Sequence, residues 1–571
     1  MTKRSARPAD FLAALIRTGY LPQEVPPVVT ARYFAEYCKR DFQKIRAAMN
    51  AVKKLNTQYS TFSAPRTANT RRNLALVHPV AQLALSLLLC EHRAKVREVI
   101  RRSKATLYSV EEDMASSKAF AGLNFREWDK RREKVAAECA FILKADISRF
   151  FYTAYTHSLP WAVLGKAKAK DWWASQQKKL KSHWSNKLDD ALQACQSRET
   201  FGIPVGPDTS RIIAELLLAG VEKDAKFLSA VKGRPACRLM DDFVIGFDDE
   251  DSARAGLISL RHALWAFNLQ LNDEKTGVQS SKHSFKERWR LDFDSSPLVD
   301  ADTLSQERHL TRLLDVTLYC CTEADSGRPA AWACNRIGKL TKIQRNFSLA
   351  LDVLFRLSRE YPVCVSHVAE FLINHQVRCA TPDFRSRISK WAKATIKTHL
   401  PQGHDFEVSW ALLVCGALQI KVSNDDMISA AGTPSPVIFA ILGMLSERGL
   451  LEFSLKNWPW RADFKRAGIT SDNWLPFYEA VRRKWTSDKA MVNAVKGHPI
   501  LSAMLAADVT FLEDQIFDVA EINIARRVFR KRKGVVAGKS NNTAEQRVPK
   551  LSRPEPSIFP FKRFMRAEFD Y

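Results

Sequence analysis

Three aspartates have the residue type and the surroundings that metal-assisted chemistry requires. A short apolar run at 140–143 leads to Asp146, which predicts a buried strand that ends at this residue. Asp241 and Asp242 lie between the segments 238–240 and 243–245, where the tip of a hairpin would lie. Mg²⁺ prefers hard oxygen ligands, and a pair of Mg²⁺ ions about 3.5–4 Å apart can activate an attacking hydroxyl and hold a triphosphate. If the strands are neighbours in one sheet, the three carboxylates converge.

Adjacent aspartates alone are weak evidence for such a site. The chain has three other pairs, at 189–190, 248–249 and 425–426. The pair at 241–242 differs because it follows a strand-terminal aspartate and a loop rich in glycine and proline at 202–207, and because apolar segments surround it. This conjunction predicts the metal site.

The elements that must position these residues indicate an α+β protein. The region from 140 to 280 reads as strand, helix, helical insertion near 168–200, helix, two strands of a hairpin, helix and strand, which is close to a split βαβ arrangement. Residues 1–45 and 74–95 read as helical, and the highly charged stretch 97–135 also predicts helix. From about 300 to 525 the pattern is nearly all helical, with proline breaks, and is typical of an α-solenoid.

The charge and the cysteines narrow the class of protein. Lys and Arg total 88 and Asp and Glu total 62, a net charge of +26, which favours a polyanionic partner such as nucleic acid. A solvated basic surface and an anionic membrane surface are the alternatives. The first residues lack an apolar signal core and no apolar run has the length of a membrane span, so we expect a cytoplasmic protein without a membrane partner. The eleven cysteines show no zinc-ligand spacing, and we expect inert thiols.

Four segments resemble the motifs of reverse transcriptases. Residues 144–151 resemble motif A, 202–207 with Ser210 motif B, 239–242 motif C, and 271–276 motif D. The segments 155–161 and 207–211 are most similar to the bacterial abortive-infection reverse transcriptases, phage-exclusion proteins related to AbiK. The motifs lie between about 66 and 280, two fifths of the chain.

The resemblance implies a domain order. It implies N-terminal helices and fingers at 1–135, a palm with a helical insertion at 136–295, and an all-α, HEAT-like domain at 296–530. A basic and polar tail would occupy 531–571. Such proteins are commonly oligomers, so a homo-oligomer is expected.

The resemblance also implies a role for single residues. Asp146, Asp241 and Asp242 match the carboxylates that bind Mg²⁺, with Mn²⁺ as an alternative ion. The backbone at Ile147 would help to hold the triphosphate and metal, and Gly206 would let the substrate approach the backbone.

Three side chains match further roles, each with a plain structural alternative. Phe151 matches the aromatic steric gate that favours dNTPs, although it could equally pack in the core. Lys275 matches a general acid for pyrophosphate, although an ordinary surface lysine is nearly as good an interpretation. Arg72 matches the arginine that grips triphosphate with its planar fork, and Arg66 and Arg71 are rivals for that role.

Two departures from the family pattern bear on templating. Val205 stands where motif B usually has glutamine, and Leu239 stands where motif C usually has an aromatic residue. Apolar side chains at these positions weaken the case for template-directed copying. They fit the abortive-infection group, whose members make DNA from dNTPs without a template and attach the single-stranded product to their own tyrosine. None of the eleven tyrosines is marked as the primer by its local sequence.

Two other functions remain as alternatives: a conventional RNA-templated reverse transcriptase, and a nucleic-acid-binding scaffold with a vestigial polymerase fold. The intact aspartate trio argues against the scaffold. A basic run at 526–533 could bind product DNA through its phosphates, or could be a solvated helix end. The residues of that run that would contact DNA are Arg526, Arg527, Arg530 and Lys531.

Overall fold

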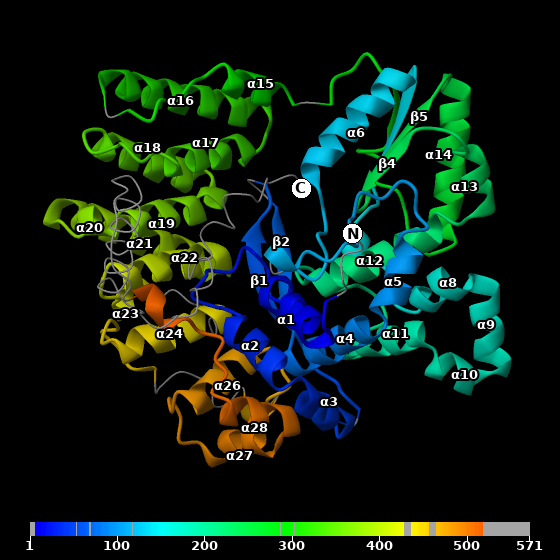
Figure 1. Ribbon diagram of the computed structural model, residues 1–571. Coiled ribbons are helices and arrows are strands. Elements are labelled where there is room, and N and C mark those ends of the chain that lie inside the picture. The colour runs from blue at the N-terminus through cyan, green and yellow to red at the C-terminus, as the bar shows by residue number, and fades with distance from the viewer. Residues whose placement is uncertain are drawn as a thin grey trace, which may run out of the picture.

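The computed structural model is a mixed α+β protein in which helices predominate (Figure 1). It describes residues 6–52, 54–67, 70–116, 118–285, 287–301, 303–427, 435–455, 464–466 and 468–517. The basic run at 526–533 and the tail therefore lie outside the described residues.

A four-stranded sheet carries the predicted metal ligands. Its strands are β3 (Phe141–Ala145), β4 (Ala236–Leu239), β5 (Asp242–Phe247) and β6 (Gly277–Ser280). Their order is β4-β5-β3-β6, and every neighbouring pair is antiparallel. The predicted succession of strands and helices between 140 and 280 is confirmed, with α12 (Asp208–Val221) before the hairpin and α14 (Glu250–Trp265) after it.

Both faces of this sheet are covered, which explains why its central strands are largely apolar. Alternate residues of a strand point to opposite faces. Ile142 and Val244 pack with Trp128 of α6 (Phe125–Glu138) in a small core. Leu143 and Ile245 point the other way, into the main core that α14 joins.

A second, two-stranded sheet lies between the N-terminal helices and the C-terminal helical region. Its strands are β1 (Ser60–Pro65) and β2 (Arg71–Leu76), which pair antiparallel with Phe62 opposite Leu74. The chain then enters α4 (Pro79–Glu91), and β1 also contacts α22 (Asp405–Ala417). The hairpin therefore continues into α4 and packs against α22 (Figure 1).

The other helices before the sheet are α1 (Pro8–Gly19), α2 (Arg32–Arg40), α3 (Phe42–Asn50) and α5 (Arg93–Ile100). The expected helix over 97–135 is wrong between 101 and 124. There Tyr108, Val110 and Phe120 turn inward, and Ser109 pairs with Gly122 across an extended loop. Tertiary burial of these side chains overrides the helical propensity of the charged stretch.

The insertion consists of short helices that project from the lower right of Figure 1. After α7 (Phe150–Thr153) and α8 (Ser158–Leu164), the chain forms α9 (Lys166–Ser175), α10 (Gln177–Ser182) and α11 (Trp184–Ala194). Only α11 is buried along much of its length, because it packs on α4 and α8.

Beyond residue 287 the described chain is nearly all helical, as predicted. The helices of this region, which we call the helical region, are α15 (Arg288–Asp294), α16 (Leu304–Glu323), α17 (Arg328–Gly338), α18 (Phe347–Glu360), α19 (Val365–Asn374), α20 (Gln376–Cys379), α21 (Pro382–His399), α22, α23 (Asn424–Met427), α24 (Pro436–Glu447), α26 (Trp474–Arg482), α27 (Lys489–Gly497) and α28 (Pro499–Ala506).

Helices of this region pack on near neighbours in the chain, and α22, all of whose residues are buried, lies at the centre. Helix lengths run from 4 to 20 residues without a constant pairing. A HEAT-like repeat and the domain boundaries therefore stay predictions.

Two further expectations concern the cysteine thiols and a membrane-spanning helix. All eleven cysteines are free, and only Cys139 has an intermediate exposure while the others are buried. In the part of the chain that the structure describes, no helix combines the length and apolar character needed to cross a bilayer.

Candidate active site

The three aspartates meet at one end of the central sheet. Antiparallel pairing sets Ala145 opposite Phe243, so the register, continued by one residue, brings Asp146 opposite Asp242. Asp241 lies in the tight turn between β4 and β5, after Met240, whose φ of 53° is left-handed. A non-glycine residue in this conformation is uncommon and costs roughly 1–3 kcal/mol, so the surrounding structure must hold the turn.

The carboxylates oppose one another electrostatically. Burial raises the pKa of Asp241 to about 6, and the charge of Asp146 adds to this effect. Burial, followed by the charges of Asp241 and Asp146, raises the pKa of Asp242 to about 7. Carboxylates held together in this way are stabilised by bound cations, because a cation offsets both the repulsion and the lost hydration.

Lys275 reaches this cluster from the segment before β6. Its Nζ lies 3.2 Å from Oδ2 of Asp146. The segment is fixed to motif A by backbone pairing: Ile147 bridges Leu271, and the N–H of Asn272 donates to the carbonyl of Asp146 at 2.8 Å. The predicted lysine is therefore brought to the carboxylates, as is the backbone at Ile147.

A fully buried arginine, absent from the sequence-based prediction, holds the hairpin turn. Arg238 donates from Nε to Glu222 at 2.6 Å and from Nη2 to Glu215 at 3.0 Å. Its Nη1 donates to the carbonyl of Met240 at 2.9 Å, one residue before Asp241. The only signals in the sequence are an arginine within a short strand and a glutamate within the apolar helix α12.

Of the three arginines proposed for triphosphate binding, Arg71 is engaged elsewhere. It forms a bidentate ion pair with Glu407 of α22, with both N–O distances at 2.8 Å. Arg72 lies close enough to the carboxylates to oppose the rise in the pKa of Asp241. Arg66 and Arg72 both line the cavity described below.

Phe151 belongs to motif A and lies next to the motif B loop, which contains Gly206. The N–H of Ile203 donates to the carbonyl of Phe151 at 2.6 Å, and the Phe151 ring lines the cavity. Phe150 also borders the cavity but is more deeply buried. Gly206 has a φ of +129°, and a Cβ there would lie 2.7 Å from Cγ of Pro22. Glycine is required at this position by the backbone conformation and by protein packing.

The carboxylates lie in a cavity of about 800 Å³, which also contains Val205 and Leu239 in its lining. Basic side chains outnumber acidic ones by ten to five among the described residues that line it. The basic residues are Arg66, Arg71, Arg72, Arg132, Lys144, Arg149, Arg211, Lys275, Arg290 and Arg328. A pocket that combines carboxylates at one point with cations elsewhere suits a phosphate-bearing substrate that is bound together with metal ions.

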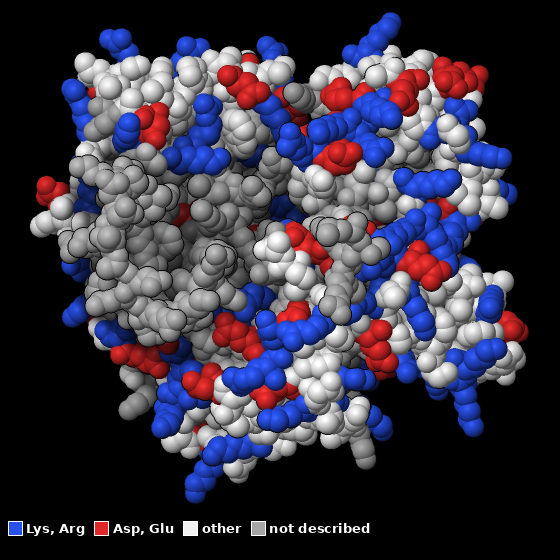
Figure 2. Space-filling view, viewed as in Figure 1, with Lys and Arg blue, Asp and Glu red and all other residues white. Residues whose placement is uncertain are grey.

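The outer surface is also basic. On the face seen in Figure 2, Lys and Arg side chains are widely spread, with dense groups over α5 and α6. Acidic side chains lie between them, so much of this charge is locally compensated. Residues Arg526, Arg527, Arg530 and Lys531 lie outside the described residues, and their proposed contact with DNA stays a prediction.

The comparisons with known proteins give little. No family model matches the sequence, and no curated protein matches it. Among solved structures, the chain is similar to an apo telomerase from Candida tropicalis, with 12% identity and 67% of each chain covered. The TM-score is 0.28, and a similarity of this extent carries no argument about the fold or the activity.

Proposed function

We propose that this protein is a reverse-transcriptase-type DNA polymerase that transfers nucleotides from dNTPs with two divalent metal ions. The observation that carries the proposal is the convergence of Asp146, Asp241 and Asp242 from two neighbouring strands and their hairpin turn into a basic cavity. In this interpretation the four-stranded sheet is the palm, and β1–β2 belongs to the fingers.

The donor set fits Mg²⁺, with Mn²⁺ as the alternative. All three side chains supply hard oxygen atoms. The pKa values of Asp241 and Asp242 are raised first by burial and then by the neighbouring carboxylate charges, and bound cations would offset both effects. Two ions bound here would lower the pKa of the attacking hydroxyl and neutralise the triphosphate. Asp146, Asp241 and Asp242 would hold them.

The transfer itself exchanges one bond for another. A hydroxyl gives its proton to a water molecule, its oxygen bonds to the α-phosphorus of the dNTP, and the bond from that phosphorus to the β-phosphate oxygen breaks. Pyrophosphate leaves and takes up a proton, for which Lys275 is the proposed donor. Arg72 and Phe151 both line the cavity. In this proposal Arg72 binds the phosphates bidentately and the Phe151 ring presses on a ribose 2′-hydroxyl.

We further propose that synthesis is untemplated, primed by a tyrosine of the protein, and used to exclude phage, as in the abortive-infection group that the sequence resembles. Val205 and Leu239 support the absence of a template, because both apolar side chains line the cavity. Single-stranded DNA would then be the product, joined covalently to the chain.

Tyr152 is the candidate primer that the cavity favours. It is the only tyrosine among the described lining residues, and it is 45% exposed. Its hydroxyl donates a long hydrogen bond of 3.3 Å to the carbonyl of Asn73, which leaves it weakly held. Tyr20, Tyr108 and Tyr478 are buried, so their hydroxyls are withdrawn from substrate.

The test is a denaturing gel of purified protein incubated with labelled dNTPs and Mg²⁺. We expect label to migrate with the protein without any added template, and Tyr152→Phe to remove it. Tyr319→Phe is the matched control, because Tyr319 is 59% exposed on α16 and does not line the cavity. Label that persists in Tyr152→Phe would exclude Tyr152 as the primer.

The same reaction separates the rival functions. A product whose yield and sequence follow an added RNA template and primer would indicate a conventional reverse transcriptase. If Asp241→Asn leaves the biological activity intact, the protein is a scaffold with a vestigial site.

A further inference from the structure

A second group of potential metal ligands lies in the helical region, at the turn between α21 and α22. His399 is the last residue of α21, and the 3-10 turn η3 (Leu400–Gln402) leads through Gly403 to His404. Gly403 has a φ of +66°, which lets the chain reverse within five residues. Glu407 follows in the first turn of α22.

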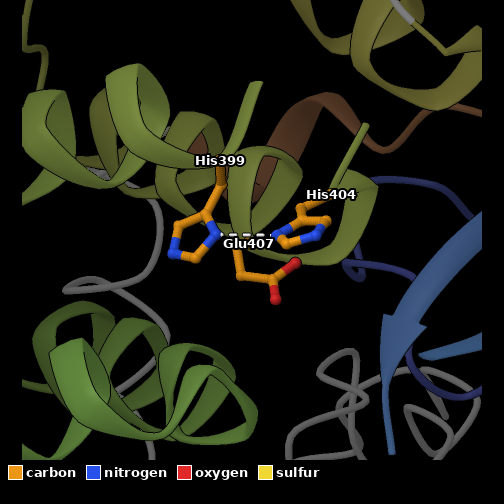
Figure 3. A group of neighbouring side chains, drawn as sticks. All are labelled: His399, His404 and Glu407. Atoms are coloured by element: carbon orange, nitrogen blue, oxygen red, sulfur yellow. Dashed lines mark hydrogen bonds between the residues drawn. The ribbon is translucent and has the colours of Figure 1, made fainter. Parts of the chain in front are cut away.

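The three side chains face one another (Figure 3). The Nδ1 atoms of His399 and His404 are 2.9 Å apart, and one atom of each residue, including a carboxylate oxygen of Glu407, lies within 4.8 Å of the others. Among the described residues, this is the one group of histidine, cysteine and acidic side chains with such spacing. Asp146, Asp241 and Asp242 are near enough for their charges to interact, but their carboxylate oxygens are not all this close to one another. The arrangement is compact enough for one ion.

The donor atoms suit a zinc-class ion and not Mg²⁺. Zinc binds imidazole nitrogen at about 2.0–2.1 Å and accepts a carboxylate oxygen, whereas Mg²⁺ prefers oxygen alone. Two nitrogens on a tetrahedral zinc are about 3.3 Å apart, so a small opening of the pair would admit the ion.

Glu407 is already oriented for this role by a partner on the β1–β2 hairpin. The carboxylate is fully buried, and Arg71 holds both of its oxygens. Arg71 is itself fixed by Ser63, whose Oγ accepts from Nε at 2.6 Å. A carboxylate oxygen has two lone pairs, so one can accept from Arg71 while another binds a metal. Carboxylate ligands are commonly oriented by a second hydrogen-bonding partner in this way.

We propose that His399, His404 and Glu407 bind one zinc-class transition-metal ion, with water completing its coordination. The ion would fasten the α21–α22 turn and, through Glu407 and Arg71, the hairpin that carries Arg72. The site is separate from the three aspartates, and the inference does not rest on the proposed polymerase function.

The alternative is a histidine pair that only shares a hydrogen bond. The separation of 2.9 Å fits an N–H···N contact in which one Nδ1 carries the proton. Metal binding would require that proton to move to the other ring nitrogen. The two states therefore differ in something measurable, namely affinity for a metal with nitrogen ligands.

The test uses the full chain, stripped with a chelator, in an Asp241→Asn/Asp242→Asn background so that the carboxylate site contributes little. Co²⁺ is added in the presence of excess Mg²⁺, its visible absorption is recorded, and Zn²⁺ is then titrated in by calorimetry. We expect one equivalent of Co²⁺ with the strong absorption of four-coordinate nitrogen ligation, displaced by one equivalent of Zn²⁺. His399→Ala/His404→Ala should weaken Zn²⁺ binding by at least about 100-fold.

The matched control is His262→Ala/His283→Ala, because both residues are exposed histidines outside the group. It should bind Zn²⁺ as the parent does. The proposal is overturned if the parent binds no stoichiometric Zn²⁺, or if the His399→Ala/His404→Ala variant binds it equally well. If that variant does not fold, the Co²⁺ spectrum of the parent decides: absorption typical of six oxygen ligands contradicts the site.

Discussion

The two candidate metal sites of this protein differ in both chemistry and construction. Asp146, Asp241 and Asp242 offer oxygen alone and come together only when β3, β4 and β5 form a sheet. His399, His404 and Glu407 offer nitrogen and oxygen from one helix–turn–helix segment of nine residues. The first set suits Mg²⁺ and a substrate that arrives with phosphates, and the second suits a resident zinc-class ion.

An arginine in an ion pair nevertheless supports each site. Arg238, held by Glu215 and Glu222, supports the turn before Asp241. Arg71 holds Glu407 against the β1–β2 hairpin. The difference lies in exposure: Arg238 is fully buried, whereas the Arg71 side chain is 23% exposed. In both candidate sites, an ion pair that includes an arginine fixes the position of the proposed ligands.

The largest effect expected is on catalysis at the carboxylate site. Asp241→Asn removes one charged ligand, and we expect nucleotide transfer to fall by at least about 10³-fold, or about 4 kcal/mol. Single-turnover incorporation of labelled dNTP measures this. Asp248→Asn is the control, because Asp248 is exposed and forms only a surface pair with Arg234. Equal loss in both variants would remove the distinction between the aspartate pairs.

The next effect concerns the buried arginine. Arg238→Met leaves Glu215 and Glu222 without their cation, and the free energy of unfolding should fall by about 3–5 kcal/mol. Chemical denaturation followed by circular dichroism measures it. Arg254→Met, which breaks an exposed i,i+4 pair with Glu250, should change it by under about 1 kcal/mol. Similar losses of unfolding free energy in the two variants would contradict the proposal that Arg238 stabilises the hairpin turn.

A smaller effect is expected for the lysine at the carboxylates. Lys275→Gln removes the proposed proton donor and its contact with Asp146, and the rate of transfer should fall by about 100-fold. Lys282→Gln, an exposed lysine just past β6, serves as the control. A rate that stays within about twofold of the parent would make Lys275 an ordinary surface lysine.

The smallest effect is the dependence of stability on pH that the carboxylate site causes. The pKa of Asp241 is raised from 3.8 to about 6 and that of Asp242 to about 7, so without metal the folded protein holds protons more tightly than the unfolded chain. Metal-free stability should therefore rise as the pH falls from about 7 toward 4, by about 1–2 kcal/mol after allowance for solvent access.

Variants and metal sharpen that pH test. Asp241→Asn should flatten the pH dependence and raise metal-free stability at neutral pH, measured by denaturant unfolding at several pH values. Asp405, which is buried, and Glu370, which is partly buried, add a dependence of the same sign, because desolvation raises their pKa values to about 6 and about 8. The Asp241 contribution is therefore the difference between the parent and Asp241→Asn. No difference between the two would contradict the repulsion.

The sequence predicts the elements of the sheet and the meeting of its aspartates because Asp146 follows an apolar segment and Asp241 and Asp242 precede one. It does not predict the supports of the site. Arg238 binds Glu215 across 23 residues, and Arg71 binds Glu407 across 336, so no local pattern joins them. The stretch 101–124 misleads for a related reason, since the burial of Tyr108 and Phe120 is decided by tertiary packing. The histidine pair is local, and its gap of four residues lies within the spacing of zinc ligands, but without cysteines nearby the sequence alone does not distinguish it from an ordinary helix end.

The most direct test of the central claim is the intact mass of the purified full chain, incubated with dNTPs and Mg²⁺ and no template, before and after nuclease treatment. The account predicts added mass in steps of nucleotide residues. Nuclease should shorten the adduct without removing the nucleotide joined to the protein, and Asp241→Asn should stay at the mass of the bare chain. Protein-primed synthesis at these three aspartates would be contradicted if the folded parent protein stays at the mass of its sequence. The folded Asp248→Asn variant should then stay at the mass of its own sequence as well.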